Sequence, residues 1–266
     1  MPGDYIIAPL RAEPYNTGVL QPQLKPRSSG QGRVTDIRGG WRLAIPAGPA
    51  SHYRLAQLDD YAKRSRRAFP WRPPITLSLQ ARASTSASPG TWGFGLWNDP
   101  FGLSLGFGGG NLLPALPQAA WFFFASPENH LALKDHQPGN GALAGTFRAS
   151  AAAWALAPAA PLLLLRPAAR ALRRAAAAMI PTAAQAIEVE PTKWHRYSIN
   201  WLAEQVHFSI DGKEVLRTPQ SPRAPLGLVL WIDNQYAAWR PSGQLAYGTL
   251  ASQTEHWIEI KDLQLA

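Results

Sequence analysis

The sequence predicts an all-β fold, a β-sandwich or jelly roll, on three observations. Eleven tryptophans, 22 glycines and 25 prolines among 266 residues are typical of many short strands joined by turns rather than of a helical bundle. Apolar and polar residues alternate in several segments, most regularly in Ile75–Ala83. Asp211-Gly212 lies between two such segments and is a hairpin signal. A chain of this length can form one large β domain with an extended core.

We expect an irregular basic N-terminal arm over residues 1–40 and a β-sandwich domain over residues 41–266. The arm is rich in Pro, Gly, Ser and Arg and has little periodicity, apart from an early strand at Arg33–Ile37. The first residues contain no recognisable secretory signal. The absence of cysteine is compatible with the cytosol or the exterior. Localisation therefore stays open.

From Trp41 onward the alternation predicts a succession of strands separated by turn residues. The expected strands are Trp41–Ile45, Ile75–Ala83, Thr91–Trp97, Phe101–Phe107, Ala119–Ala125, His195–Leu202, Gln205–Ile210, Lys213–Arg217, Leu226–Ile232 and Trp257–Leu265. Within them, the continuous run Trp121–Phe124 is typical of a strand that is buried on both faces.

Residues 149–187 differ from the rest and predict a helical insertion that interrupts the domain. Residues 149–165 carry no charge, but Pro158 and Pro161 interrupt them, so they do not make a convincing transmembrane segment. Pro167 is well placed to begin a helix that ends near Met179. We expect the insertion to pack as a flap on the domain, with peripheral membrane contact through residues 162–179 as the alternative.

On that helix an apolar stripe and a basic stripe are expected on different faces. The apolar stripe consists of Leu165, Ala169, Leu172, Ala176 and Met179, and the basic stripe of Arg166, Arg170, Arg173 and Arg174.

Two aromatic runs, Trp92–Asp99 and Trp231–Tyr236, end in small polar side chains and predict a shared ligand site. Indole rings stack on the C–H faces of sugars, whereas carboxylates and amides bind hydroxyls, so a glycan or another amphipathic ligand is expected. The alternative interpretation assigns the tryptophans to the core and the Asp-Asn pairs to ordinary turns. The predicted ligand-binding residues are Trp92, Trp97, Asn98, Trp121, Trp231, Asn234, Gln235 and Tyr236.

The segments Trp194–Trp201 and Val206–Lys213 resemble paired strands of the concanavalin A-like lectin/glucanase superfamily, particularly family 16 glycoside hydrolases. The first reads W-H-R-Y-S-I-N-W and the second V-H-F-S-I-D-G-K. Pro222–Trp231 and Gly90–Trp97 resemble further strands of that family, so that the resemblance covers roughly residues 70–130 and 190–266. It implies a concanavalin A-like jelly-roll sandwich with ligand lying across the concave face of one sheet.

The chain departs from this family at the catalytic strand. In those hydrolases the strand carries Glu-x-Asp-x-(x)-Glu, whereas the corresponding stretch Gln118–Ala125 contains no carboxylate. A retaining mechanism needs two carboxyl groups about 5–5.5 Å apart, so glycoside hydrolysis of the family type is not expected. Glu128, just beyond the strand, is interpreted as a turn residue. The Trp-Phe-Phe-Phe run instead predicts a hydrophobic pocket at this part of the face.

Three functions are compatible with these features. The first is a non-hydrolytic protein that binds a glycan or amphipathic ligand. The second is an enzyme in which Asp99 and Asp233 act as relocated acids on a glycan or on an apolar small molecule such as a terpenoid or polyketide, by cyclisation, isomerisation or hydration. The third is a structural or peripheral membrane module that uses the basic arm and the Arg-bearing helix.

Signals for nucleic acid, cofactors and metals are weak. The net charge is +9, but the densest basic cluster, Lys63–Arg67, has no accompanying nucleic-acid-binding motif and is interpreted as a solvated segment. The glycines at 106–110 lack the strand–helix context of a phosphate loop, and the six histidines do not fall at a metal-binding spacing. No cofactor or metal ligand is predicted, although a structural calcium held by backbone and Asp oxygens is not readable from sequence.

Overall fold

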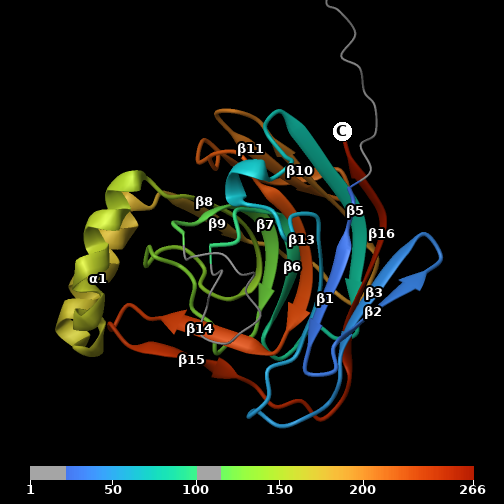
Figure 1. Cartoon of the computed structure of the whole chain (residues 1–266), viewed down its shortest axis with the longest axis horizontal. Coiled ribbons are helices and arrows are strands. Elements are labelled where there is room, and N and C mark those ends of the chain that lie inside the picture. The colour runs from blue at the N-terminus through green and yellow to red at the C-terminus, as the bar shows by residue number, and fades with distance from the viewer. Residues whose placement is uncertain (1–21, 101–114) are drawn as a thin grey trace, which may run out of the picture.

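The computed structural model describes residues 22–100 and 115–266, in which two antiparallel seven-stranded sheets form a sandwich (Figure 1). The expected all-β sandwich with a helical insertion is confirmed by this arrangement. The expected strand Phe101–Phe107 and the glycines at 106–110 lie outside the described residues.

The first sheet, the site sheet, carries the aromatic runs. Its strands, in spatial order, are β1 (Lys25–Ser29), β4 (Leu55–Asp59), β13 (Gly227–Asp233), β6 (Thr91–Trp97), β7 (Gln118–Ala125), β8 (Gly141–Arg148) and β9 (Thr182–Ala186). The central strands β13 and β7 are buried almost throughout on both faces. That double burial explains why they are continuous apolar runs rather than alternating ones.

The second sheet, the back sheet, contains the paired strands of the W-H-R-Y-S-I-N-W and V-H-F-S-I-D-G-K segments. Its strands, in spatial order, are β12 (Lys213–Thr218), β11 (Val206–Ile210), β10 (His195–Trp201), β5 (Ile75–Ala83), β16 (His256–Leu265), β3 (Gly40–Ile45) and β2 (Arg33–Ile37). β5 alternates strictly between buried and half-buried residues, as its sequence predicted. Asp211 and Gly212 have φ of 51° and 81° and make the tight turn between β11 and β12.

The main core lies between the two sheets. Phe122 on the site sheet contacts Tyr197 and Phe208 on the back sheet, with ring centroids 4.9 and 5.4 Å apart. Each of these side chains is almost fully buried, and burial of one large apolar side chain stabilises a fold by about 1.5–3 kcal/mol. The inward side chains of both sheets are therefore buried in the core and cannot contact a ligand. The outer face of the site sheet, which carries the aromatic runs, is the place to look for one.

The remaining elements are η1 (Arg66–Ala68), η2 (Ala151–Leu164), α1 (Arg166–Met179), β14 (Gln235–Trp239) and β15 (Leu245–Thr249). Figure 1 shows α1 standing beside the sandwich, with one end of the β14–β15 hairpin reaching the lower end of the helix. No helix in residues 22–100 or 115–266 has the length and apolar character needed to cross a bilayer.

Three expectations need correction. Lys25–Ser29 pairs within the site sheet, so this part of the expected irregular arm belongs to the sandwich, as does the expected early strand Arg33–Ile37 in the back sheet. The helical part of the insertion ends at Met179, and Thr182–Ala186 is already a strand of the site sheet.

Arg173 is the third correction, because it is buried rather than part of a solvent-facing basic stripe. Its guanidinium donates to the Trp239 carbonyl at 3.0 Å and to the Ala132 carbonyl at 2.8 Å, and it pairs with the Asp135 carboxylate. A buried guanidinium is tolerated when its donors are satisfied in this way. Arg173 therefore fixes α1 to the β14–β15 hairpin and to the loop before β8.

Candidate ligand site on the outer face of the site sheet

Three tryptophans meet on the outer face of the site sheet. Trp97, Trp121 and Trp231 come from the adjacent strands β6, β7 and β13, and their alternation places them on one side. The rings of Trp97 and Trp231 are parallel with centroids 6.1 Å apart, and the Trp121 and Trp231 centroids are 5.9 Å apart. Phe123 adds a fourth ring, 5.5 Å from Trp231. The structure thus brings together three of the predicted ligand-binding residues as an aromatic floor.

Gly93 makes room for the centre of this floor. It pairs with Trp231 across the β6–β13 ladder and carries no side chain on the outer face. A Cβ at this position would lie 2.7 Å from the Trp231 ring and 2.4 Å from the Phe122 carbonyl oxygen. The indole of Trp231 can lie against the backbone of β6 only because residue 93 is glycine.

Trp92 does not belong to this floor. It faces the back sheet, is 3% exposed, and stacks on Phe124 with centroids 3.5 Å apart. Trp92 and Trp97 are five positions apart, so strand alternation places them on opposite faces of β6. The prediction that Trp92 binds ligand on the same face as Trp97 is therefore corrected: its ring packs in the core.

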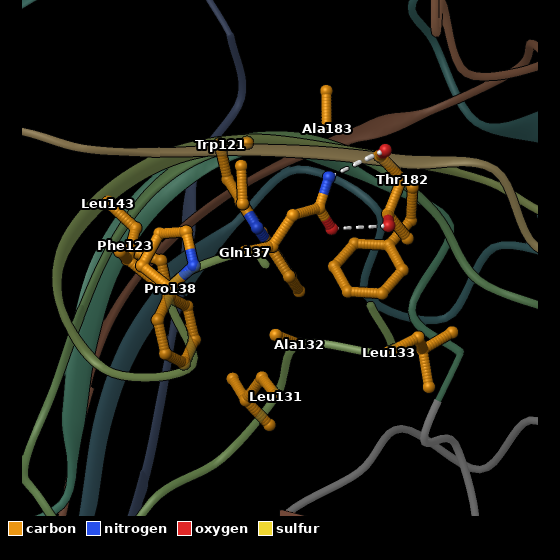
Figure 2. Close-up of a pocket in the computed structure, with 13 residues that line it drawn as sticks. Trp121, Phe123, Leu131, Ala132, Leu133, Gln137, Pro138, Leu143, Thr182 and Ala183 are labelled. Carbon is orange, nitrogen blue, oxygen red and sulfur yellow. Dashed lines mark hydrogen bonds between the residues drawn. The ribbon is translucent and has the colours of Figure 1, made fainter. Parts of the chain in front are cut away.

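An apolar pocket opens on the outer face of β7–β9, with a volume of about 400 Å³ that includes its open mouth. Trp121 and Phe123 form part of its floor, and the loop before β8 forms the facing wall (Figure 2). The other lining residues are Leu131, Ala132, Leu133, Gln137, Pro138, Leu143, Gly145, Phe147, Thr182, Ala183 and Ala184. On β7, where the family resemblance implies catalytic carboxylates, this chain has the aromatic rings of Trp121 and Phe123, which line the pocket.

The polar groups of this pocket are paired side by side at one edge. Gln137 donates from its amide to the Thr182 carbonyl at 3.0 Å, and the Thr182 hydroxyl donates back to the Gln137 side-chain oxygen at 2.8 Å (Figure 2). Both side chains keep further hydrogen-bonding capacity, because an amide has two N–H donors and a hydroxyl oxygen can also accept. They can therefore bind the polar end of a ligand.

The opposite half of the outer face holds a hydrogen-bonded polar network. The Tyr61 hydroxyl accepts hydrogen bonds from Trp97 Nε1 at 2.8 Å and from the Gln57 amide at 3.3 Å. Gln57 also donates to Asp59 at 2.9 Å, and Arg27 lies 3.5 Å from the same carboxylate. Burial raises the pKa of Tyr61 well above its usual range, so this hydroxyl stays neutral. This network was not predicted from the sequence.

Asp233, at the end of β13, is buried and makes hydrogen bonds that are separate from this network. Its Oδ1 accepts from the Thr91 hydroxyl at 2.8 Å, and its Oδ2 accepts from the Tyr53 hydroxyl at 3.4 Å. Trp231 Nε1 in turn donates to Thr91 Oγ1 at 3.0 Å, which links Asp233 to the aromatic floor. Burial raises the pKa of Asp233 to about 7, and the hydrogen bonds only partly oppose that rise.

Asp99, the other predicted acid, is not placed beside Asp233. Asp233 pairs with Thr91 at one end of β6, whereas Asp99 follows Trp97 at the other end. At about 3.4 Å per residue, the length of β6 puts the two acids roughly 20 Å apart. Asp99 is 2% exposed, has a φ of 46°, and its backbone oxygen accepts from Arg66. The two acids therefore do not form a general acid/base pair.

The two predicted asparagines hold turns. Asn234 is fully buried, accepts from the Arg54 backbone N–H at 2.8 Å and donates to the Leu250 carbonyl at 2.8 Å. Asn98 accepts from the Gln118 N–H at 3.0 Å and donates to the Leu116 carbonyl at 2.9 Å. These bonds use the side-chain groups that were expected to bind ligand, so the turn interpretation describes both residues better.

Gln235 and Tyr236 lie in the hairpin rather than on the site sheet. Both are half-buried residues of β14, which pairs with β15. The Tyr236 ring packs over Gly248, whose Cβ position is 3.1 Å from it. Neither side chain is part of the aromatic floor.

That the protein uses no metal or cofactor stays a prediction. Within residues 22–100 and 115–266, no three His, Asp or Glu side chains are grouped so as to hold a metal ion. A structural calcium bound mainly by backbone oxygens would not depend on such a group.

Comparison with known proteins adds a likeness to solved structures. No protein-family model matches the sequence, and no curated protein matches it. A glycosyl hydrolase family 16 protein of Mycobacterium smegmatis has a TM-score of 0.48 at 10% identity, with 91% of each chain covered. LamA of Z. galactanivorans, solved with laminaritriose and laminaritetraose, has a TM-score of 0.47 at 13% identity, covering 87% of this chain and 80% of that one.

A third similar structure is the catalytic domain of an endo-1,3-beta-glucanase (laminarinase) from Thermotoga petrophila. Its TM-score is 0.43 at 10% identity, and 86% of this chain and 80% of that chain are covered. These proteins are of the kind that the Trp194–Trp201 motif resembles. Each of these three TM-scores is below 0.5, so the likeness carries no argument about function.

Proposed function

We propose that the protein is a non-hydrolytic binding protein for an amphipathic ligand, whose apolar part enters the pocket over β7–β9. The observation that carries this proposal is the lining of that pocket. Trp121 and Phe123 occupy its floor, and its walls are almost entirely apolar. Such a lining favours apolar surface over hydroxyl-rich or charged groups, because polar groups buried without partners are destabilising.

The size and edge of the pocket support a small ligand with one polar end. The enclosed part of the pocket is only about 30 Å³, so it has room for a small apolar group, and the rest of a ligand would lie in the open mouth. Gln137 and Thr182 supply hydrogen-bonding groups at one edge only. A sugar ring that carries an apolar substituent has this pattern, with C–H groups for Trp121 and hydroxyls for the edge. Alkyl glycosides are therefore suitable probes.

Binding without hydrolysis is favoured by the positions of the acids. β7 carries no carboxylate, and Asp99 and Asp233 lie at opposite ends of β6 and β13. Neither arrangement supplies the closely spaced pair of carboxyl groups that retaining hydrolysis needs.

A pocket-filling substitution tests the proposal. Ala184 lines the pocket from β9, whereas Ala186 lies two residues further along the same strand face, is exposed, and is not part of the lining. In calorimetric titrations with a series of alkyl glucosides and with the corresponding free oligosaccharides, Ala184→Phe should weaken binding at least tenfold. Ala186→Phe should bind like the wild type. Absence of heat with every probe, or equal binding by Ala184→Phe, would contradict the proposal.

The buried carboxyl of Asp233 supports a second candidate, an enzyme that uses this group as a general acid or base. A pKa of about 7 suits proton transfer near neutral pH. Mass spectrometry of candidate glycans or terpenoids incubated with the protein would reveal a product if this is correct. Asp233→Asn should then lose that turnover while keeping its fold, and full activity of this variant on any identified substrate would remove Asp233 from the role.

A further inference from the structure

Within residues 22–100 and 115–266, large apolar side chains are exposed in the insertion and on β15. Leu162, Leu164 and Leu165, where η2 gives way to α1, are 49%, 89% and 60% exposed. Leu245 and Tyr247, on β15, are 41% and 61% exposed. η2 itself contains no polar side chain, so the apolar character extends along the insertion.

The two segments meet at one corner of the molecule, which we call the apolar corner. The Cβ position of Gly243, just before β15, lies 2.3 Å from the Arg166 carbonyl oxygen, so only glycine allows this close approach. Arg170 also donates to the Ser242 carbonyl at 3.2 Å. Figure 1 shows the tip of the β14–β15 hairpin against the end of α1 at this place.

The exposed part of the basic stripe, without the buried Arg173, borders the apolar corner along α1. Arg166, Arg170 and Arg174 are exposed and recur every four residues, which places them on one side of the helix. The sequence has no Asp or Glu between His136 and Ile187, so the insertion has no acid of its own to neutralise them. The nearby Asp135 is already paired with the buried Arg173.

We propose that the apolar corner and this stripe dock the protein on an anionic lipid bilayer. Exposed leucines can enter the acyl boundary, Tyr247 suits the headgroup level, and the arginines attract anionic headgroups. Charge complementarity favours an anionic bilayer as the occupant, because the stripe carries positive charge without acids. The surface is held in place as a unit, because Arg173 anchors α1 by three contacts.

Vesicle flotation of the full chain tests this proposal. The wild type should float with phosphatidylcholine vesicles that contain phosphatidylglycerol, and much less with phosphatidylcholine alone. Arg166→Gln/Arg170→Gln/Arg174→Gln should lower partitioning onto the anionic vesicles by roughly tenfold or more, since each basic residue near the surface contributes to attraction. Leu164→Ser/Leu165→Ser should lower it by about tenfold, through loss of buried apolar area.

A matched triple variant separates this surface from general attraction by a basic protein. Arg38→Gln/Lys193→Gln/Lys213→Gln removes the same charge from exposed sites at or beside the back sheet and should float like the wild type. Circular dichroism should show that every variant is folded. Failure of the wild type to float, or equal losses in the two charge variants, would overturn the proposal.

Two further measurements complete the test. If size-exclusion chromatography shows that the Leu164→Ser/Leu165→Ser variant abolishes self-association and no variant changes flotation, the corner is an interface between copies and the proposal fails. Membrane docking through the apolar corner does not depend on the ligand pocket. Ala184→Phe should therefore float like the wild type even if it no longer binds the ligand.

Discussion

The outer face of the site sheet has two halves that differ in how their side chains are used. In the polar half, Tyr61 and Asp59 accept hydrogen bonds from neighbouring side chains, and Gln57 joins them. In the apolar half, Trp121 and Phe123 contact one another through their rings and leave open space above β8 and β9. The same strand geometry supports both halves, so the difference arises from the side chains alone.

This difference shows that polar residues in a sheet face do not by themselves mark a binding site. A hydrogen bond within the protein contributes only about 0.5–1.5 kcal/mol, but leaving one buried partner unpaired costs more. The polar half is therefore committed to the fold, because a ligand would have to replace bonds that are already made. The apolar half has unused contact surface, and it is there that binding can add contacts without removing any.

Trp231 lies between the two halves, and its replacement should have the largest effect. Trp231→Ala removes a buried indole that contacts Trp97 and Trp121 and donates to Thr91, so we expect a loss of about 3–5 kcal/mol in the free energy of unfolding. Urea-induced unfolding measures it. Trp154→Ala is the matched control, because Trp154 is 53% exposed and should cost less than about 1 kcal/mol. Similar losses in both variants would contradict a shared floor.

Asp233, buried at the end of β13 outside both halves, should give the fold a pH dependence that the apolar half lacks. Its pKa is raised to about 7, above the unfolded value of roughly 3.9, so the folded protein binds the extra proton between these pH values. The stabilisation is complete below about pH 4 and is lost as pH rises through 7. Asp233→Asn should remove on the order of 2–3 kcal/mol of this dependence, measured by urea unfolding at pH 5 and pH 8.

The pH test has an internal control. Asp60 is also buried, with its pKa raised to about 6, and it remains in the Asp233→Asn variant. The variant should therefore keep a smaller decrease in stability with rising pH. An unchanged pH dependence would mean that Asp233 is ionised in the fold.

Gln137→Leu should have the smallest effect, because it changes only the edge of the apolar half. It removes the pair of hydrogen bonds with Thr182, which water can partly replace, so the free energy of unfolding should fall by about 1 kcal/mol or less. Affinity for an apolar fluorescent probe, followed by tryptophan emission, should be unchanged or higher. A loss as large as that of Trp231→Ala would show that polar contacts also hold this half.

Much of the fold could be predicted because several strands alternate regularly. The bounds Ile75–Ala83 and Thr91–Trp97 are those that the sequence indicates. β4 was missed because all of its residues are buried although two are polar, and the burial of these two depends on partners outside the strand, among them Arg27 and Tyr61. Contacts between distant segments are not encoded in the local pattern.

The candidate site was predictable in part for the same reason. Strand alternation places Trp97 and Trp121 on one face, and it also excludes Trp92, which a stricter count along β6 would have shown. The facing wall of the pocket was not predictable, because the loop at Ala132 is held by Arg173 from a helix 41 residues further along the chain. The separation of Asp99 from Asp233 likewise follows from strand pairing rather than from sequence spacing.

The contact between Gly93 and the Trp231 indole has a consequence for how this protein can change during evolution. Any side chain at position 93 would meet both that ring and the Phe122 carbonyl oxygen, so a smaller residue at 231 would not by itself make room for one. Loss of Trp231 would leave a cavity and a destabilised protein. The dependence between the two positions therefore runs one way: an indole at 231 requires glycine at 93, whereas position 93 should stay glycine even where residue 231 has changed.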